Sequence, residues 1–559
     1  MSMSITPSAP NRGLVVFSGG SAANNLVDVF NAVRENKDCP LSYIIPISDN
    51  GGSSSELIRM FGGPGIGDVR SRLVRLIPPS PPNSERAAIK TLFNHRLPTD
   101  DSAHSEWLSI VDGTSPVWRS ITSAKKELIR SFFNLLNLEI LKRSRPPTST
   151  FDFSSASVGN LFLTGARLFS GSFESAIYLL SNICDVPSDL VRVIPAINSN
   201  FSHHISASLA NGTIIVGQNS ISHPSLPPRP ASPRPNILLQ TDGLSPPNID
   251  LAIDYTEPSD VLDTALYEDD QPPGFLPHLR NKNINYSKSE NEDLPARISR
   301  IWYINPYGQE IRPRANPRVL ESLRDAQAII YSIGSLYTSL IPSLILQGVG
   351  QAIVSSPARL KILILNGSLD RETGPLDQAF TAVDFVEAIT RAGEESRGRN
   401  LPPAGTSPAA SSFPPSSPYL NPDIESGFGS ASGSDSGSTL TTFPFLPPPT
   451  VHNNINNLGL SLPYTSYITH VLHLDGPGTP HVDRDRLAAM GIETLRLYGR
   501  KIMPSTDNAR EVPVGMRYDS AGLIQALEVV LGKKGDAMIR GAEGLSRRNT
   551  LDPGRKRGV

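Results

Sequence analysis

Cysteine and tryptophan are scarce in this chain, and neither sign of charge is in large excess. Its 559 residues include 2 Cys and 3 Trp, and 51 Lys and Arg against 53 Asp and Glu leave a net charge of −2. Two cysteines, Cys39 and Cys184, exclude a disulfide framework, and the ten histidines show no spacing typical of a zinc site. A near-neutral chain carries no basic footprint for nucleic acid. We therefore expect a protein of a reducing compartment without a nucleic-acid partner.

Segments for export or membrane insertion are also lacking. The stretch that begins Met1-Ser2-Met3 has no basic start and no apolar run, so we expect no export. Residues 326–358 contain no charge and are long enough for a membrane span, but Ser, Gly, Pro and Gln interrupt them. We read them as a buried strand over 328–333, a polar turn over 334–339 and a buried helix from Pro342. The expected location is cytoplasmic, with no membrane partner.

Proline, in contrast, is abundant: 51 residues are nearly twice the ~5% typical of globular chains. Residues 401–450 hold 11 Pro, 11 Ser and 5 Gly, a composition that resists packing into a core. We predict an N-terminal tail over 1–12, a single α/β domain over 13–534 and a basic C-terminal tail over 535–559. Inside the domain we expect a helical insertion over 78–150, a Pro-rich insertion over 222–295 and a disordered Pro/Ser/Gly-rich insertion over 397–457.

Two apolar runs end in loops of small polar residues. Residues 14–17 precede Ser-Gly-Gly-Ser at 18–21, and residues 43–47 precede Ser-Asp-Asn-Gly-Gly-Ser at 48–53. A buried strand that turns on glycines into a helix presents backbone N–H groups, and such a helix start attracts phosphate. The glycine pair at 19–20 fits neither G-x-G-x-x-G nor a P-loop, so a plain tight turn is the alternative.

Charged residues near these loops are candidates for chemistry. Asp49 at the tip of the second loop can hold a cation, accept a proton, or satisfy local N–H groups as a turn residue. Ser53 and Glu56 match a capping box that begins a helix. Asp68 follows a glycine-rich turn and is expected to cap the next helix. Arg70 opposes the dipole preference of that helix start, so it either faces a ligand or is a solvated charge.

Strand and helix patterns alternate outside the Pro-rich regions. Asn211-Gly212 between two strand-like runs predicts a hairpin with a type I′ turn. His203 and His204 lie on opposite sides of that strand, which favours a polar edge over a shared metal. The alternation on both sides of each insertion predicts one doubly wound α/β domain with a mostly parallel sheet. Helices are expected over 124–141, 173–184, 483–490 and 520–531, a further helix from 157, and strands over 191–196, 467–475 and 492–497.

The order of the motifs resembles the CofD-like superfamily, which joins 2-phospho-L-lactate transferases to the YvcK-type gluconeogenesis factors that bind nucleotide sugars. The long insertions and several substitutions are typical of a divergent member nearer to the YvcK-type loop pattern. The matching stretches are 15–22, Asp-Asn-Gly-Gly-Ser-Ser at 49–54, Gly-Asp-Val-Arg at 67–70, Ser-Val-Gly-Asn-Leu at 157–161, Gly-Ser-Leu-Tyr-Thr-Ser at 334–339, Asn-Gly at 366–367, Glu-Thr-Gly at 372–374, 381–386 and Arg-Tyr-Asp at 517–519.

The resemblance implies a Rossmann-like crevice for a nucleoside-diphosphate-linked small molecule, with magnesium as cofactor, in a possible homo-oligomer. One implied function is transfer of a phospho-linked group from the nucleotide donor to an acceptor hydroxyl, as in LPPG:Fo 2-phospho-L-lactate transferase. The alternative is a non-catalytic nucleotide-sugar-binding regulator of carbon metabolism or morphogenesis, and a third interpretation is a scaffold whose Pro/Ser segments recruit partners.

The site residues that the resemblance implies fall into two sets. Asp49, Asn50 and Asp68 are the expected catalytic residues, and Asp49 is also the expected metal ligand. The expected ligand-binding residues are Gly19, Gly20, Ser21, Asn24, Gly51, Gly52, Ser53, Arg70, Asn160, Gly334, Ser335, Tyr337, Thr338 and Ser339.

Overall fold

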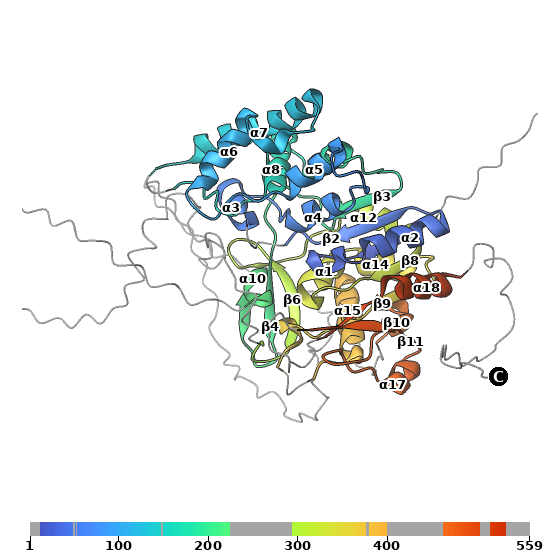
Figure 1. Ribbon diagram of the computed structural model, residues 1–559. Helices are drawn as coiled ribbons and strands as arrows, with labels where there is room; N and C mark the ends of the chain where they lie inside the picture. The colour runs from blue at the N-terminus through green and yellow to red at the C-terminus, as the bar shows by residue number, and fades with distance from the viewer. Residues whose placement is uncertain are drawn as a thin grey trace, which may run out of the picture. The chain divides into compact units, whose positions relative to one another are not determined.

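The computed structural model describes residues 12–48, 51, 53–146, 149–223, 293–375, 379–399, 462–503 and 515–532. Within them a seven-stranded parallel sheet has the order β11-β10-β9-β8-β1-β2-β3 (Figure 1). Its central strands are apolar on both faces, as expected of strands covered by helices on both sides. The predicted Rossmann-like α/β fold is confirmed. The strands are β1 (Gly13–Phe17), β2 (Leu41–Ile45), β3 (Val191–Pro195), β8 (Ala326–Tyr331), β9 (Leu360–Ile364), β10 (His470–His473) and β11 (Glu493–Arg496).

Helices flank the sheet in two packed groups. The helix α2 (Val27–Lys37) packs against α18 (Ser520–Leu531), and α14 (Val349–Ser355) packs against both α12 (Pro317–Arg324) and α15 (Ala382–Ser396). Each helix buries an apolar stripe, and a fully buried Phe or Val stabilises the fold by about 1.5–3 kcal/mol. The remaining helices near the sheet are α1 (Gly20–Asn24), α3 (Ser53–Phe61), α4 (Gly67–Arg75), α8 (Val158–Ser170), α9 (Phe173–Ile183), α10 (Gln218–Ser222), α13 (Ile341–Leu344), α16 (Tyr464–Tyr467) and α17 (Arg484–Ala489).

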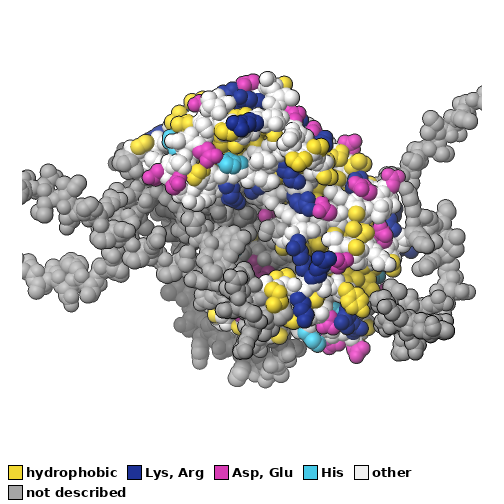
Figure 2. Space-filling view, viewed as in Figure 1, with side chains coloured by type: hydrophobic (Ala, Val, Ile, Leu, Met, Phe, Trp, Pro, Cys, Tyr) yellow, Lys and Arg dark blue, Asp and Glu magenta, His cyan; other side chains and the backbone are white. Residues whose placement is uncertain are grey.

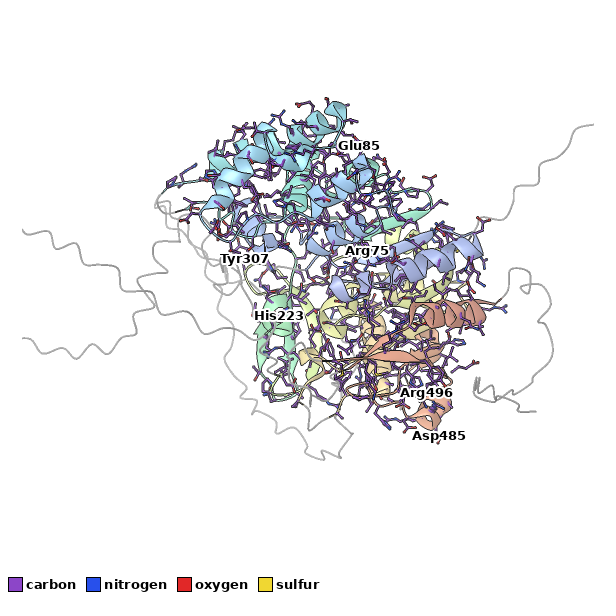
Figure 3. All side chains as sticks on the ribbon, viewed as in Figure 1. Arg75, Glu85, His223, Tyr307, Asp485 and Arg496 are labelled. Atoms are coloured by element: carbon purple, nitrogen blue, oxygen red, sulfur yellow. The ribbon has the colours of Figure 1, made fainter. Side chains whose placement is uncertain are left out.

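Between α4 and α8 the chain forms the helices α5 (Glu85–Asn94), α6 (Ser102–Asp112) and α7 (Ser123–Arg143), of which α7 is the longest. The Trp107 ring of α6 meets the Phe133 ring of α7 edge-on at 5.2 Å. α7 packs directly on α8 because Gly165 has no side chain, and a Cβ there would lie 2.4 Å from the Phe132 carbonyl oxygen. Arg75, labelled in Figure 3, lies at the end of α4 and forms an ion pair with Asp28 of α2.

A second, antiparallel sheet has the order β5-β4-β6-β7, with β4 (His204–Leu209), β5 (Ile214–Val216), β6 (Ile298–Ile304) and β7 (Glu310–Ile311). The predicted hairpin is confirmed as β4 and β5, but its turn type is wrong. Gly212 has a φ of +88°, whereas Asn211 keeps a negative φ, and a type I′ turn needs positive φ at both. His204 is 3% exposed, so its prediction as part of a polar edge is also wrong.

The polar turn predicted over 334–339 is partly helical. A π-helical turn, η4 (Leu336–Leu340), runs directly into α13. Ser53, the predicted N-cap, is the first residue of α3, and its side chain lies outside the described part of the chain, so the capping box stays a prediction. The Glu56 carboxylate binds Arg59 at 2.7 Å and accepts the Asp152 N–H at 2.8 Å.

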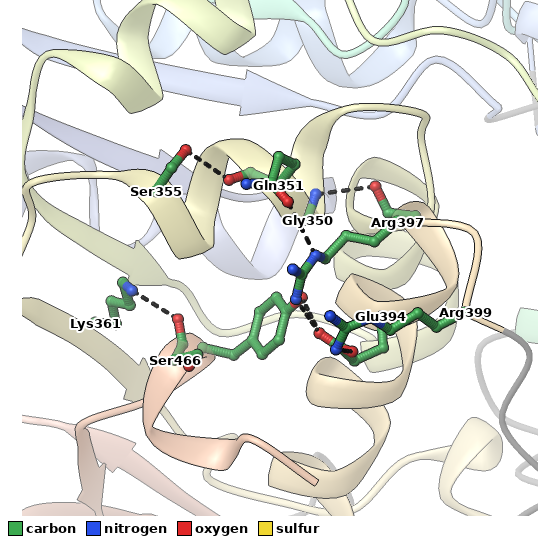
Figure 4. Close-up of polar contacts among 10 residues, drawn as sticks. Gly350, Gln351, Ser355, Lys361, Glu394, Arg397, Arg399 and Ser466 are labelled. Atoms are coloured by element: carbon green, nitrogen blue, oxygen red, sulfur yellow. Dashed lines mark hydrogen bonds and ion pairs between the residues drawn. The ribbon is translucent and has the colours of Figure 1, made fainter. Parts of the chain in front are cut away.

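The residues that flank positions 400–461 are joined to each other. Glu394 is 2% exposed and binds Arg397 and Arg399, which precede these positions, at 2.8 and 2.6 Å. It also accepts the Tyr467 hydroxyl, which follows them, at 2.7 Å (Figure 4). We call these four residues the Glu394 clasp. The insertions predicted over 222–295 and 397–457 otherwise lie almost wholly outside the described residues.

Acidic and basic side chains are interspersed with apolar ones over the face shown in Figure 2. No helix in the described part of the chain is long and apolar enough to cross a membrane.

Candidate functional site

The sheet order places a topological switch between β1 and β8. The strand order runs β1, β2, β3 toward one edge of the sheet. On the other side of β1 it runs β8, β9, β10, β11 toward the opposite edge. At such a point the loops at the carboxyl ends diverge to opposite faces and leave a crevice. Ser332 N–H donates to the Phe17 carbonyl at 3.0 Å, so the loops that follow β1 and β8 start side by side.

A cavity of about 330 Å³ lies in this region. Its walls come from α1 and the residues after it, from the loops after β8 and β9, and from a hairpin formed by β12 (Gly499–Ile502) and β13 (Gly515–Tyr518). Apolar and polar groups share the lining, as in most small-molecule sites. The lining residues are Ala22, Asn25, Leu26, Ile333, Gly334, Ser335, Asn366, Gly367, Ser368, Asp370, Ile502, Met516, Arg517, Tyr518 and Ser520.

Asp68 does not cap α4, contrary to the prediction. It lies in the first turn of that helix, whose N-cap is Ile66, and its Oδ2 accepts the Gly20 N–H at 2.7 Å. Burial raises the pKa of Asp68, while the Gly20 N–H, Arg72 and Arg70 oppose that rise. The structure therefore brings Gly20 and Asp68 together, but a carboxylate of the protein takes the N–H that was expected to serve phosphate.

Arg72, which was not predicted as a site residue, supports the loop after β1. Its side chain is 1% exposed and donates to Ser18 Oγ at 3.2 Å and to the Ala23 carbonyl at 3.3 Å. The guanidinium carbon lies 4.6 Å from the centre of the Tyr43 ring. A buried cation beside Asp68 partly compensates that carboxylate and ties β1 and β2 to α4.

Arg70 is buried, so the alternative that it is a solvated charge is wrong, and the ligand-facing alternative stays a prediction. It is 9% exposed, and its Nε donates to Asn160 Oδ1 at 3.1 Å. Burial lowers the pKa of Arg70 to about 10. The Arg70 side chain packs against Gly159, where a Cβ would lie 2.8 Å from its Cδ. Arg70 and Asn160 thus join α4 to α8, and Asn24 joins α1 to α4 by donating to Ser71 Oγ at 2.7 Å.

The loops after β1 and β8 meet at glycines. A Cβ on Gly19 would lie 3.0 Å from Ser339 Cβ, and Gly334 has a φ of +142° that side chains rarely tolerate. Asn366, after β9, exchanges two hydrogen bonds with Gly334: its Oδ1 accepts the N–H at 3.0 Å, and its Nδ2 donates to the carbonyl at 2.9 Å. Gly19, Gly334 and Ser339 therefore lie close together.

Tyr337 and Thr338 are committed to a buried carboxylate. Glu372 Oε2 accepts the N–H groups of Tyr337 and Thr338 at 2.9 and 3.1 Å, and its Oε1 accepts the hydroxyls of Thr338 and Ser222 at 2.5 and 3.1 Å. Burial, with the nearby charge of Asp370, raises the pKa of Glu372 to about 8. Tyr337 and Thr338 therefore stabilise the start of η4 through Glu372.

Several predicted residues are not described in full. Asp49, Asn50 and Gly52 lie outside the described residues, as do the side chains of Ser21 and Ser53. In the described part of the chain, no group of three His, Cys, Asp or Glu side chains could hold a metal. Gly51 is described, and its carbonyl accepts the Ser54 N–H at 3.1 Å.

The polar residues of the cavity wall that were not predicted as site residues include Asn366, Asp370 and Arg517, although Asn366 and Arg517 belong to motifs that carry the resemblance. Each follows β9 or belongs to β13, and the gathering of strand ends at one edge of a parallel sheet could have identified the first two. Arg517 is exposed, and its Nη2 donates to Asn25 Oδ1 at 3.2 Å. Nothing local in the sequence indicates that this hairpin returns to β1.

Comparison with known proteins identifies a matching family model and several relatives. A family model described as 2-phospho-L-lactate transferase CofD matches residues 14–401. An uncharacterized protein of Saccharomyces cerevisiae is 42% identical over 386 residues, which are 68% of this chain and 83% of that protein. A gluconeogenesis factor of Bacillus subtilis is 21% identical over 379 residues, 68% of this chain and 74% of that protein.

One more relative and one solved structure are similar over long stretches. A gluconeogenesis factor of Halalkalibacterium halodurans is 23% identical over 380 residues, 68% of this chain and 73% of that protein. A crystal structure of a Bacillus halodurans protein described as a member of the UPF0052 family has a TM-score of 0.46 at 18% identity, with 93% of this chain and 100% of that chain covered.

Proposed function

The chain belongs to the 2-phospho-L-lactate transferase CofD family, and from this membership we propose that it binds a nucleoside-diphosphate-linked small molecule between β1 and β8. The observation that carries the proposal is the cavity of about 330 Å³ at the topological switch point. Open α/β sheets bind their ligands at that place because the loops at the carboxyl ends part there.

The cavity offers groups suited to both ends of such a ligand. Arg517 presents an exposed guanidinium, whose planar set of N–H donors binds phosphate oxygens in pairs. Gly334 permits close approach to backbone, and the apolar side chains of Ile333 and Met516 can cover a ring face. The hairpin that carries Arg517 follows the residues matched by the family model, 14–401, so it joins the cavity from a distant part of the sequence.

Binding that regulates carbon metabolism is the function that these features support best. The bacterial relatives are named gluconeogenesis factors. Among the described lining residues Asp370 is the one carboxylate, and Asp68 is engaged by the Gly20 N–H. A regulator needs affinity and a response to its ligand, whereas transfer chemistry also needs groups that stabilise developing charge.

Transfer of a phospho-linked group to an acceptor hydroxyl is the second candidate, favoured by the description of the family model. Phosphoryl-type transfer depends on positioned donors and charge neutralisation. Magnesium would supply that neutralisation when bound, with Asp49 as the proposed ligand. The described residues offer no cluster of three His, Cys, Asp or Glu that fits a metal, so this candidate depends on Asp49, which lies outside them.

One experiment separates these candidates. The pure protein is incubated with GDP-, UDP- and CDP-linked compounds and plausible acceptors, with and without magnesium, while melting temperature and nucleotide products are both followed. The regulator proposal expects a raised melting temperature with intact donor. Release of a nucleotide product would support the transferase instead, and no thermal response to any compound would reject both.

A further inference from the structure

Asp370 lies where a ligand in the cavity would meet it. It follows β9 and precedes a short 3₁₀ turn, η5 (Arg371–Thr373), and it lines the cavity together with Ser335 and Ser368. Its Oδ1 is enclosed and has no hydrogen-bond partner among the described residues. The neighbouring Glu372, in contrast, has both carboxylate oxygens engaged by donors of η4 and α10.

An enclosed carboxylate oxygen without a donor costs free energy. Burial raises the pKa of Asp370 to about 6, and the Ser335 hydroxyl with the N–H groups of Glu372 and Thr373 only partly opposes that rise. Most buried polar atoms of native proteins have partners, so an uncompensated one in a cavity wall calls for an explanation. A carboxylate in this state is a strong acceptor for a donor that a ligand brings.

The surrounding groups favour a hydroxyl as that donor. A divalent cation usually takes several oxygen ligands, and no cluster of three acidic or metal-binding side chains occurs in the described part of the chain. The lining instead combines Ser335 and Ser368 with the apolar Ile333 and Met516, and Arg517 supplies a cation for phosphate. Such a mixture suits a molecule that joins a sugar to a diphosphate.

We propose that Asp370 accepts a hydrogen bond from a hydroxyl of the bound ligand, either on its ribose or on a sugar joined to its diphosphate. The inference rests on the proposed function, since it assigns a specificity-determining residue to the same cavity. It makes Asp370 the residue that distinguishes hydroxyl-bearing ligands from analogues that lack the hydroxyl, because a missing donor leaves the carboxylate uncompensated.

Calorimetric titration of Asp370→Asn and the full-length wild type tests this assignment. The probes are UDP-glucose, UDP and 2′,3′-dideoxy-UDP, with the GDP and CDP counterparts, each with and without magnesium. The control is Asp475→Asn, which changes an exposed carboxylate paired with Arg496. Melting temperatures show that each variant is folded. Because Asp370→Asn removes an uncompensated charge, its melting temperature is expected to equal or exceed that of the wild type.

We expect Asp370→Asn to weaken binding of the hydroxyl-bearing probe roughly 10- to 100-fold, the range for a charge-assisted hydrogen bond. If the variant loses affinity for UDP-glucose alone, the hydroxyl belongs to the attached sugar. If it loses affinity for UDP but not for dideoxy-UDP, the hydroxyl belongs to the ribose. Unchanged affinities, equal loss for every probe, or a loss seen only with magnesium would overturn the assignment to a hydroxyl. If the wild type binds no probe, the proposed function itself fails and this inference falls with it.

Discussion

Gly20 donates its N–H to Asp68 Oδ2 across 2.7 Å, and this bond joins the loop after β1 to the first turn of α4. The carboxylate occupies the start of α1, where positive backbone dipoles attract an anion. Asp68 therefore acts as the protein's own anion at this loop. The neighbouring cavity borders this loop on the side lined by Ala22, Asn25 and Gly334, where the proposed ligand would place its phosphate.

Replacement of Asp68 tests this relationship. Asp68→Ala leaves the Gly20 N–H without its acceptor and is expected to lower the free energy of unfolding by about 1–3 kcal/mol. Asp68→Asn retains a carbonyl oxygen that can accept the Gly20 N–H, so its loss of unfolding free energy should be clearly smaller. Urea denaturation measures both variants. Equal losses in the two would show that the charge beside Arg72, and not the hydrogen bond, matters at this position.

Gly334→Ala tests whether the backbone at the crevice serves a ligand. Gly334 has a φ of +142°, so a side chain strains the backbone by about 1–3 kcal/mol, although its Cβ would meet Ser339 only at 3.5 Å. Gly532→Ala is the matched control, with a φ of +74° and nothing within 4 Å of the added Cβ.

Both glycine variants should lose stability, and Gly334→Ala alone should lose affinity for a nucleoside diphosphate. Thermal melting and calorimetric titration measure the two effects. An unchanged affinity in Gly334→Ala would argue that ligand does not approach this loop.

Glu372 predicts a pH dependence of stability. Burial raises its pKa to about 8 in the folded protein, from a usual value of 4.5. Between these values the folded state binds a proton that the unfolded state releases, so this group's contribution falls as pH rises from about 5 to 8. Glu372→Gln cannot titrate and should flatten the dependence, which is on the order of a few kcal/mol.

Urea denaturation at pH 5, 6, 7 and 8 compares the wild type with this variant. Glu310→Gln is the control, because ion pairing with Arg300 lowers the pKa of Glu310 and places its titration outside the window. If the stability of Glu372→Gln falls with pH as steeply as that of the wild type, other groups cause the dependence.

Deletion of residues 405–450 is expected to leave the fold and ligand binding intact. The Glu394 clasp already holds the two ends of this region together, and loop length changes the closure entropy by only ~0.6 kcal/mol per doubling. Circular dichroism and calorimetric titration of the deleted protein check this expectation. Glu394→Ala in the deleted protein should then lower its melting temperature, whereas insoluble protein after deletion alone would show that the segment packs.

Several helices and strands could be predicted from the sequence because their signals lie within a few neighbouring residues. The apolar run at 14–17 forms β1, the pattern over 520–531 forms α18 with those bounds, and Asn-Gly at 211–212 marks a hairpin. In each case the periodicity of apolar residues or a turn residue specifies the backbone by itself. A doubly wound, mostly parallel sheet also follows from the βα alternation, because crossovers between parallel strands are right-handed, whereas the strand order became known only from the structure.

Contacts between distant residues were beyond such reasoning. Asp68 matched a helix cap by position, but the return of the β1 loop gives it Gly20 as a partner 48 residues away. Arg70 also matched a solvated charge by position, but its side chain is buried and α8 places Asn160 beside it. Arg517 reaches the cavity because its hairpin packs on Gly367, where a Cβ would lie 1.8 Å from the Met516 carbonyl oxygen.

The sequence by itself thus determined the family, the doubly wound sheet and the edge at which the crevice opens, because period, turn residues and connection handedness are local or topological properties. Only the tertiary structure decided which polar groups face the cavity. A buried polar group must find its hydrogen-bond partner among the backbone and side-chain groups that the fold brings within reach, and those partners lie 32 to 106 residues away for Asn366, Glu372, Asp68 and Asn160.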